Sequence, residues 1–207
     1  TVDEIEEKGE DIVYDMTVAD NHNFFANGFL VSNCGREDID ARCLAFRPFV
    51  LEILEPRTRN IDFKKLAKKI DKKVNVKNLH LSNIQEVRQI KEAKLEKSYH
   101  AIVECDADIS KNELTKLNEL NSKEIKQKTP TRVMHRRADL LRRRKVISIK
   151  AKILGKKRFE LVVRGEAGLY IKELISGDEN RTNPSVSSIL GKKCVCKELD
   201  VVCIHKK

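Results

Sequence analysis

Three features that would indicate a membrane, a secretory route or a structural zinc site are missing from this sequence. No apolar run approaches the roughly 20 residues that a helix needs to cross a bilayer. The first residues, Thr-Val-Asp-Glu, do not form a signal peptide, and none of the six cysteines belongs to a Cys-x-x-Cys pair. We therefore expect a cytoplasmic protein with reduced thiols, no metal site and no membrane association. The chain starts without Met, which indicates a fragment or a processed product.

Positive charge is concentrated in one segment. Residues 123–158 contain 15 Lys and Arg residues and two acidic residues, a surplus of 13 that exceeds the net charge of +10 for the whole chain. A charged run is commonly a solvated face, but here one sign is clustered, with Arg142, Arg143 and Arg144 in succession. Such a patch is typical of a surface that binds nucleic acid. A membrane-surface role is the weaker interpretation, because aromatic anchors are missing from the segment.

The apolar pattern predicts the α+β class, with a mainly antiparallel sheet and flanking helices. With 40% hydrophobic residues, the 207-residue chain can bury a core as one large domain or one domain with an appendage. Asp62 can cap a helix over residues 63–70, and Ser110 with Glu113 forms a capping box for a second helix. Strands outnumber helices and rarely alternate with them. Strand patterns occur at residues 47–54, 98–105, 145–154, 157–163 and 195–204, the third and fourth joined by a turn at Gly155.

The first 33 residues differ from the rest and contain a predicted β-hairpin. Residues 13–18 alternate like a strand, and Asn27-Gly28 is a strong turn pair before the apolar residues 29–31. The simple interpretation is an ordinary hairpin. The segment also resembles the C-terminal splicing blocks of an intein. The matching stretches are Tyr-Asp-Met-Thr-Val at 14–18, His-Asn-Phe at 22–24, and Asn-Gly-Phe-Leu-Val-Ser-Asn at 27–33 before a cysteine.

The intein resemblance implies a splicing chemistry at the end of this segment. Asn33 would cyclise on its own carbonyl, and Cys34 would accept the acyl chain as a thiolate. His22 and Asp15 would assist proton transfer. Ser32 stands where most inteins carry His, and the N-terminal splicing block is missing. The segment would therefore act only with the complementary intein half as a partner.

Several motifs lie in one order at residues 35–40, 47–49, 132–139, 170–178, 181–184 and 198–201. Through these motifs, residues 35–207 resemble the catalytic domain of the archaeal and eukaryotic tRNA pseudouridine synthases that modify T-loop uridines. The resemblance implies the pseudouridine synthase fold, a tRNA partner, and isomerisation of uridine 54, uridine 55 or both. No cofactor is expected, because the isomerisation involves no net redox change. The family's N-terminal RNA-binding domain is absent from the sequence, so we predict a C-terminal intein fragment at 1–33 and the catalytic domain of a partial protein at 34–207.

The resemblance assigns the chemistry to one carboxylate. Asp38 would be the nucleophile, although a turn aspartate more commonly caps the backbone. Asp40, two residues on, is expected to face elsewhere. Arg36 would orient the Asp38 carboxylate or grip a phosphate, and Lys172 would lie against Asp38 and keep it ionised. The other interpretation of Lys172 is a solvated surface lysine.

The resemblance also predicts the contacts with the substrate. Tyr99 would stack on the flipped base, Tyr170 would be a second contact, and Leu199 would form the pocket floor; core packing is the alternative for all three. His135 is not expected to bind a metal, because no partner His or Cys is nearby. The predicted RNA contacts are Arg132, His135, Arg136 and Arg137 on a loop, with Arg142, Arg143 and Arg144 on the patch.

Two other functions stay open. A non-catalytic RNA-binding module would need only the basic patch. A trans-splicing intein half that carries a synthase extein would rely on residues 1–33. The relative lengths argue against that last interpretation, because the splicing motifs occupy only residues 1–33, whereas the synthase motifs extend over residues 34–207.

Overall fold

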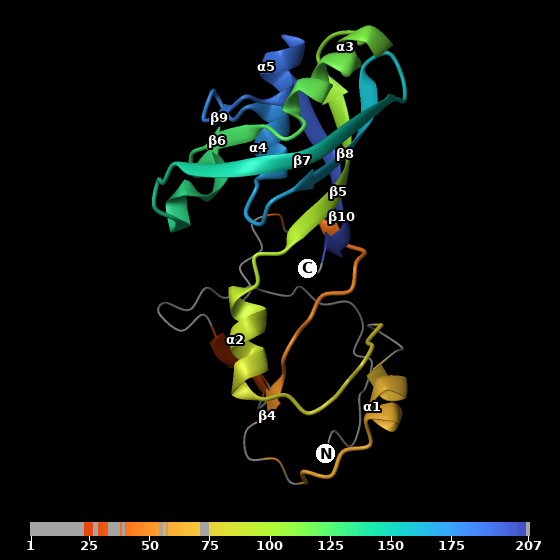
Figure 1. Cartoon of the computed structure of the whole chain (residues 1–207), viewed down its shortest axis with the longest axis vertical. Coiled ribbons are helices and arrows are strands. Elements are labelled where there is room, and N and C mark those ends of the chain that lie inside the picture. The colour runs from red at the N-terminus through yellow and green to blue at the C-terminus, as the bar shows by residue number, and fades with distance from the viewer. Residues whose placement is uncertain are drawn as a thin grey trace. The chain divides into compact units, whose positions relative to one another are not determined.

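The computed structural model of the chain describes residues 23–26, 29–32, 38, 40–53, 56, 58–70 and 75–205 (Figure 1). The chain divides into two compact units, residues 1–37 with 48–92 and residues 38–47 with 93–207. The boundary predicted between residues 33 and 34 concerns the origin of the two segments and stays a prediction.

The described residues of the first unit form a small sheet and two helices. Strands β1 (Asn23–Ala26) and β2 (Phe29–Ser32) pair in antiparallel register, which confirms a hairpin on either side of residues 27–28. The strand predicted at residues 13–18 lies outside the described residues. Strand β4 (Glu52–Ile53) pairs with β2. The helices are α1 (Phe63–Ile70) and α2 (Ile84–Glu92).

Local chemistry explains one correct and one wrong prediction in this unit. Asp62 Oδ1 accepts hydrogen bonds from two backbone N–H groups of the first turn, at 3.0 and 3.1 Å, so Asp62 caps α1 as expected. The strand predicted over residues 47–54 is wrong in extent, because among the described residues 47–53 only Glu52–Ile53 is paired. Phe49 and Leu51 in this run are more than half exposed, so no buried face enforces an extended strand there.

The second unit is built on a seven-stranded sheet in the order β3-β10-β5-β8-β7-β6-β9. Every neighbouring pair is antiparallel except β3, which runs parallel to β10. The predicted α+β class with a mainly antiparallel sheet is therefore confirmed. The strands are β3 (Arg42–Cys43), β5 (Glu96–Cys105), β6 (Glu124–Gln127), β7 (Arg142–Ile153), β8 (Arg158–Gly165), β9 (Thr182–Asn183) and β10 (Cys194–His205).

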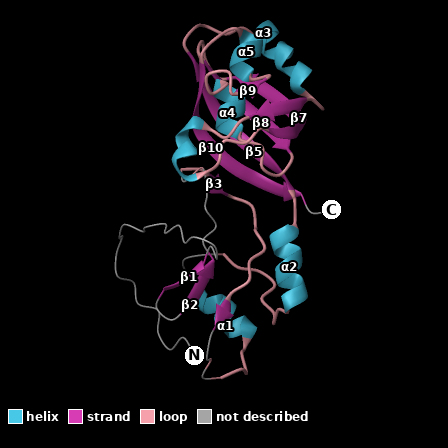
Figure 2. Cartoon of the chain, turned by 90° about the vertical axis from the view of Figure 1, so that its left-hand side faces the viewer, coloured by secondary structure: helices cyan, strands magenta, loops and turns pink. Residues whose placement is uncertain are grey.

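Helices cover one face of this sheet and enclose the core (Figure 2). Every second residue of β5 and β8 is buried, which is the alternation expected of a strand with one face on the core. Apolar residues of α3, η1, α4 and α5 join the same cluster. The helices are α3 (Lys111–Thr115), η1 (Lys116–Leu120), η2 (Thr131–Arg136), α4 (Ile171–Ser176) and α5 (Val186–Leu190), of which η1 and η2 are 3₁₀-helices.

Two predicted local features are also confirmed. Ser110 and Glu113 form the capping box of α3, since the Ser110 hydroxyl accepts from the Glu113 N–H and the Glu113 carboxylate accepts from the Ser110 N–H. β7 and β8 form a hairpin that turns at Gly155, closed by two N–H groups that donate to the Arg158 carbonyl. Within the described part of the chain, no helix is long and apolar enough to cross a bilayer.

Candidate active site

Asp38 reaches the sheet through the short strand β3. Arg42 clamps Asp200 of β10 with two hydrogen bonds, Nε to Oδ1 at 2.8 Å and Nη2 to Oδ2 at 2.7 Å. The Arg42 guanidinium lowers the pKa of the Asp200 carboxyl, and the pair ties β3 to β10. The Asp38 carbonyl accepts from the Ala41 N–H at 3.3 Å, which turns the chain just before β3. This clamp was not predicted, although Asp200 lies within one of the recognised motifs.

Helix α4 brings the other charged residues to the same place. Its N-cap, Tyr170, makes no side-chain capping bond. A buried glutamine on β6 takes over this role, because Gln127 Nε2 donates to the Tyr170 carbonyl at 2.9 Å and Gln127 Oε1 accepts from the Tyr170 N–H at 3.0 Å. This pair of bonds fixes the start of the helix. Lys172 and Glu173 follow directly and face the turn that carries Asp38.

Asp38 lies close to the cations Arg132 and Lys172, and Lys172 also binds the carboxylate of Asp40. Asp38 Oδ1 lies 2.9 Å from Arg132 Nη2 and 3.8 Å from Lys172 Nζ. Lys172 is thus near Asp38 as predicted, but its short contacts go to Asp40, at 2.6 and 2.7 Å from the two carboxylate oxygens. The expectation that Asp40 faces elsewhere is therefore wrong. The hydrogen bond from Lys172 lowers the pKa of the Asp40 carboxyl.

Glu173 is a member of this cluster that was not predicted. Its carboxylate is 4% exposed and accepts from Arg132 Nε at 2.7 Å and from Arg132 Nη2 at 3.4 Å. Burial raises the pKa of Glu173, and the Arg132 guanidinium opposes that rise. The signal in the sequence was a single acidic residue among the apolar residues Ile171, Leu174 and Ile175 of a short helix. Arg132 bridges Asp38 and Glu173, and its role as an RNA contact stays a prediction.

The predicted substrate contacts line the buried side of the same unit. Tyr99 on β5, Leu199 on β10 and Tyr170 are all less than 10% exposed. Arg142 stacks over the Tyr170 ring, with its Cζ 5.8 Å from the ring centroid. Their roles in stacking on a base and forming a pocket floor stay predictions. Burial raises the pKa of the nearby Cys196 thiol to about 12, so the thiol is protonated and does not compete as a nucleophile.

The basic residues differ in their exposure to solvent and in their bonding partners. Arg142 Nη1 donates to Thr129 Oγ1 at 2.8 Å, which fixes it beside Tyr170. Arg143 lies on the surface and pairs with Glu124 at 3.2 Å. Arg144 donates to a backbone carbonyl at 2.7 Å, and His135 and Arg137 are exposed. Some of the predicted site residues lie outside the part of the chain that the structure describes. They are Asp15, His22, Asn33, Cys34, Arg36 and the side chain of Arg136.

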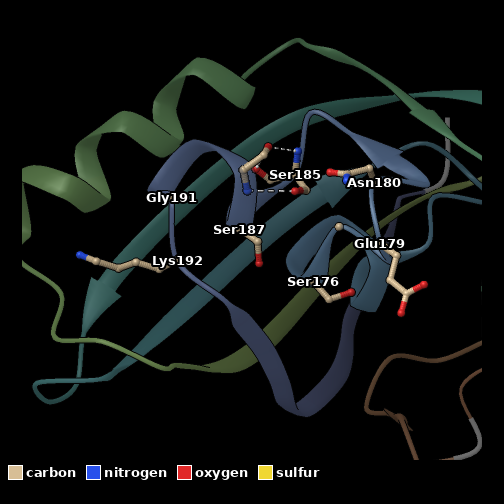
Figure 3. Close-up of a pocket in the computed structure, with 9 residues that line it drawn as sticks. Ser176, Glu179, Asn180, Ser185, Ser187, Gly191 and Lys192 are labelled. Carbon is tan, nitrogen blue, oxygen red and sulfur yellow. Dashed lines mark hydrogen bonds between the residues drawn. The ribbon is translucent and has the colours of Figure 1, made fainter.

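A hollow of about 300 Å³ lies at the C-terminal end of α4, beside α5 (Figure 3). Hydroxyls line it, but they are already engaged in the fold. Ser185 and Ser188 form the capping box of α5, and Ser187 donates to the Ile175 carbonyl at 2.9 Å. The hollow therefore offers few free polar groups to a ligand, and we place the chemistry at Asp38 instead.

The cluster at Asp38 supports nucleophilic or proton-transfer chemistry at one carboxylate. Two cations lie beside it, and a buried acid binds one of those cations. Among the described residues, no group of three or more His, Cys, Asp or Glu side chains could hold a metal ion. The cluster belongs to the same unit as the basic segment, which offers phosphate-binding charge.

Residues 3–205 match the family model described as "Pus10, C-terminal". A "tRNA pseudouridine synthase Pus10" of Methanocaldococcus jannaschii is 53% identical over 175 residues, which are 83% of this chain and 38% of that relative. A protein of the same name from Korarchaeum cryptofilum is 42% identical over 186 residues, which are 86% of this chain and 50% of the relative. The chain thus spans half or less of the length of these relatives. A solved Cbf5-Nop10-Gar1 complex aligns with 56% of this chain and 33% of its own matched chain at 25% identity, with a TM-score of 0.46, too low to carry an argument.

Proposed function

We propose that this chain, which belongs to the Pus10 C-terminal family, is the catalytic part of a tRNA pseudouridine synthase that isomerises T-loop uridines. The observation that carries the proposal is the Asp38 carboxylate held beside Arg132 and Lys172 in a chain 53% identical to a relative of that name. The fold of such synthases, a cytoplasmic location, and the absence of a cofactor are parts of the same proposal.

In this proposal Asp38 attacks the uridine, with the cations Lys172 and Arg132 beside it. The N1–C1′ bond breaks, the base rotates, and a C5–C1′ bond forms as Asp38 is released. The target uridine must leave its stack to reach Asp38, at a cost of a few kcal/mol. Contacts from the basic segment to tRNA phosphates would offset that cost. Tyr99 and Leu199 would pack against the flipped base from the side of the core.

A pair of isosteric variants tests the nucleophile. Asp38→Asn should abolish pseudouridine formation in unmodified tRNA and leave tRNA binding nearly intact, because only the reacting oxygen is lost. Asp40→Asn is the matched control, since it alters the neighbouring carboxylate that binds the same lysine. It should retain measurable turnover. A map of the pseudouridines formed would show which T-loop uridine is modified.

The outcomes separate this function from its main rival. Full activity of Asp38→Asn would contradict the proposed mechanism. Salt-sensitive tRNA binding without any product from the wild-type chain, assayed as the full-length protein, would favour the RNA-binding module that needs no catalytic carboxylate.

We propose a second role for residues 1–33, as the C-terminal fragment of an intein with the complementary half as partner. The β1–β2 hairpin around Asn27-Gly28 supports it, together with the splicing motifs that end at Asn33-Cys34. Adding the missing half of the same intein should release a product that begins at Cys34, detected by intact mass. Asn33→Ala should prevent that release. An unchanged mass with and without the complementary half would leave the segment an ordinary hairpin.

A further inference from the structure

We propose that Glu173 is a positioning residue for the proposed reaction, which holds Arg132 against Asp38 and thereby orients the nucleophile. The inference rests on the proposed function and adds Glu173 to its machinery. It also makes Arg132 the link between a buried acid and the reacting carboxylate.

Burial explains why Glu173 must hold a cation. A carboxylate that is 4% exposed is costly unless it is paired and hydrogen bonded. Arg132 meets that need, with Nε at 2.7 Å and Nη2 at 3.4 Å from the two Glu173 oxygens. The same Nη2 lies 2.9 Å from Asp38 Oδ1. One planar guanidinium therefore spans both carboxylates, which the compact ammonium group of a lysine does not do.

The backbone on either side of Arg132 is fixed to the region around α4. The Thr131 N–H donates to Asp178 Oδ2 at 2.9 Å, just beyond the end of α4. Val133 on the other side is 1% exposed, and its N–H donates to the Pro130 carbonyl at 3.0 Å. Arg181 Nη2 binds the Thr129 carbonyl at 3.0 Å. This part of η2 is thus held in place, and it presents Arg132 to Asp38 in a defined position.

Lys172 binds Asp40 more closely than it approaches Asp38. Its hydrogen bonds go to both oxygens of Asp40, and its distance to Asp38 is 3.8 Å. Lys172 therefore contributes charge near Asp38 from a greater distance than Arg132 does. The contact at 2.9 Å from Arg132 is an ion pair, since Asp38 Oδ1 accepts no hydrogen bond from the described residues, so Arg132 acts on Asp38 through charge and depends on Glu173 for its own position.

The test compares two Glu→Gln variants under steady-state conditions with unmodified tRNA. Glu173→Gln keeps the size of the side chain but removes the charge that anchors Arg132. We expect kcat to fall about 10²-fold, as for an angstrom-scale misplacement of a catalytic group, while KM and the salt dependence of tRNA binding change less than about twofold. Glu124→Gln removes the exposed partner of Arg143 and should leave kcat unchanged.

A double-variant cycle separates positioning from a general loss of structure. Arg132→Lys keeps a cation near Glu173 and provides a second variant if Glu173→Gln folds poorly by circular dichroism. If Glu173 acts through Arg132, the double variant should be no slower than the slower single variant. Additive losses, or wild-type kcat in folded Glu173→Gln, would overturn the inference and leave the synthase function standing. A drop in tRNA affinity with unchanged kcat would overturn it in favour of a phosphate contact at Arg132. If the wild type and Glu124→Gln form no pseudouridine at all, the proposed function fails and the positioning role fails with it.

Discussion

Three carboxylates of the second unit differ in what determines their ionisation. Asp40 is exposed, and a hydrogen bond from Lys172 lowers its pKa. Glu113 at the start of α3 is bound by Lys192 and by the Ser110 backbone, and these bonds lower its pKa to about 2. Glu173 is buried, and burial raises its pKa. At the scale of single residues, acidity therefore follows solvent access and the nearest donor rather than position in the sequence.

Glu113 predicts a measurable dependence of stability on pH. The pKa of Glu113 in the folded state lies below its ordinary value of 4.5. Its contribution to the stability of the fold is therefore complete above pH 4.5 and is lost as the pH falls toward about 2. Between these two pH values, Glu113→Gln should therefore lose less unfolding free energy than the wild type, as measured by urea denaturation. Glu119→Gln, an exposed glutamate on the adjacent 3₁₀-helix, is the control and should follow the wild type. Equal curves for Glu113→Gln and the wild type would contradict the assignment.

At the scale of elements, the two ends of α4 serve different purposes. Its start, held by Gln127, carries Lys172 and Glu173 to the candidate active site. Its end is a run of four residues with positive φ, from Gly177 at 83° through Asn180 at 67°. Such a run is unusual outside glycine, and it places the Asp178 carboxylate beside the Thr131 N–H of η2. The strained turn thus connects α4 to the loop that carries Arg132.

Substitution of Gly177 should show how much that turn depends on glycine. Gly177→Ala would add a Cβ at 3.0 Å from Ser185 Oγ in a left-handed conformation, so we expect a loss of about 1–2 kcal/mol of unfolding free energy. Gly155→Ala is the control, because its Cβ would meet nothing within 4 Å and no positive φ is needed there. Thermal or urea unfolding measures both. A Gly177→Ala variant as stable as Gly155→Ala would show that the turn relaxes without cost.

At the scale of the whole molecule, the net charge of +10 comes from the segment that includes β6, η2, β7 and the start of β8. Several of its cations have structural partners, as Arg132 has in Glu173 and Arg142 has in Thr129. Arg143 is mostly exposed and has only a surface pair with Glu124. Phosphate binding should therefore depend most on the exposed members of the segment.

Neutralising one exposed arginine at each end of the β7–β8 hairpin tests which exposed cations bind phosphate. Arg143→Gln should weaken tRNA binding and reduce the slope of log affinity against log salt by about one at most. Arg158→Gln removes the same charge at the start of β8, next to the hairpin turn, and should change the slope less. Filter binding across a salt series measures both. Equal slopes for the two variants would indicate diffuse attraction rather than a defined binding surface.

Patterns local in the chain determined much of this protein. The strands β5, β7, β8 and β10, the capping box at Ser110 and the turn at Gly155 could all be predicted, because each depends on residues close in sequence. The resemblance of the motifs around Asp38 and Lys172 to a known family likewise needed no coordinates. The short strand at 52–53 could not be bounded from its apolar run, since no buried face selects its length.

Only the tertiary structure decided which charges meet. Arg132, Glu173 and Asp38 come from η2, α4 and the turn before β3, up to 135 residues apart, and their contact depends on how those elements pack on the sheet. The place of Arg132 in a basic segment indicates a phosphate contact but does not reveal its pairing with Glu173. Burial explains that pairing, because a carboxylate removed from water must find a cation, and the fold places that cation beside Asp38.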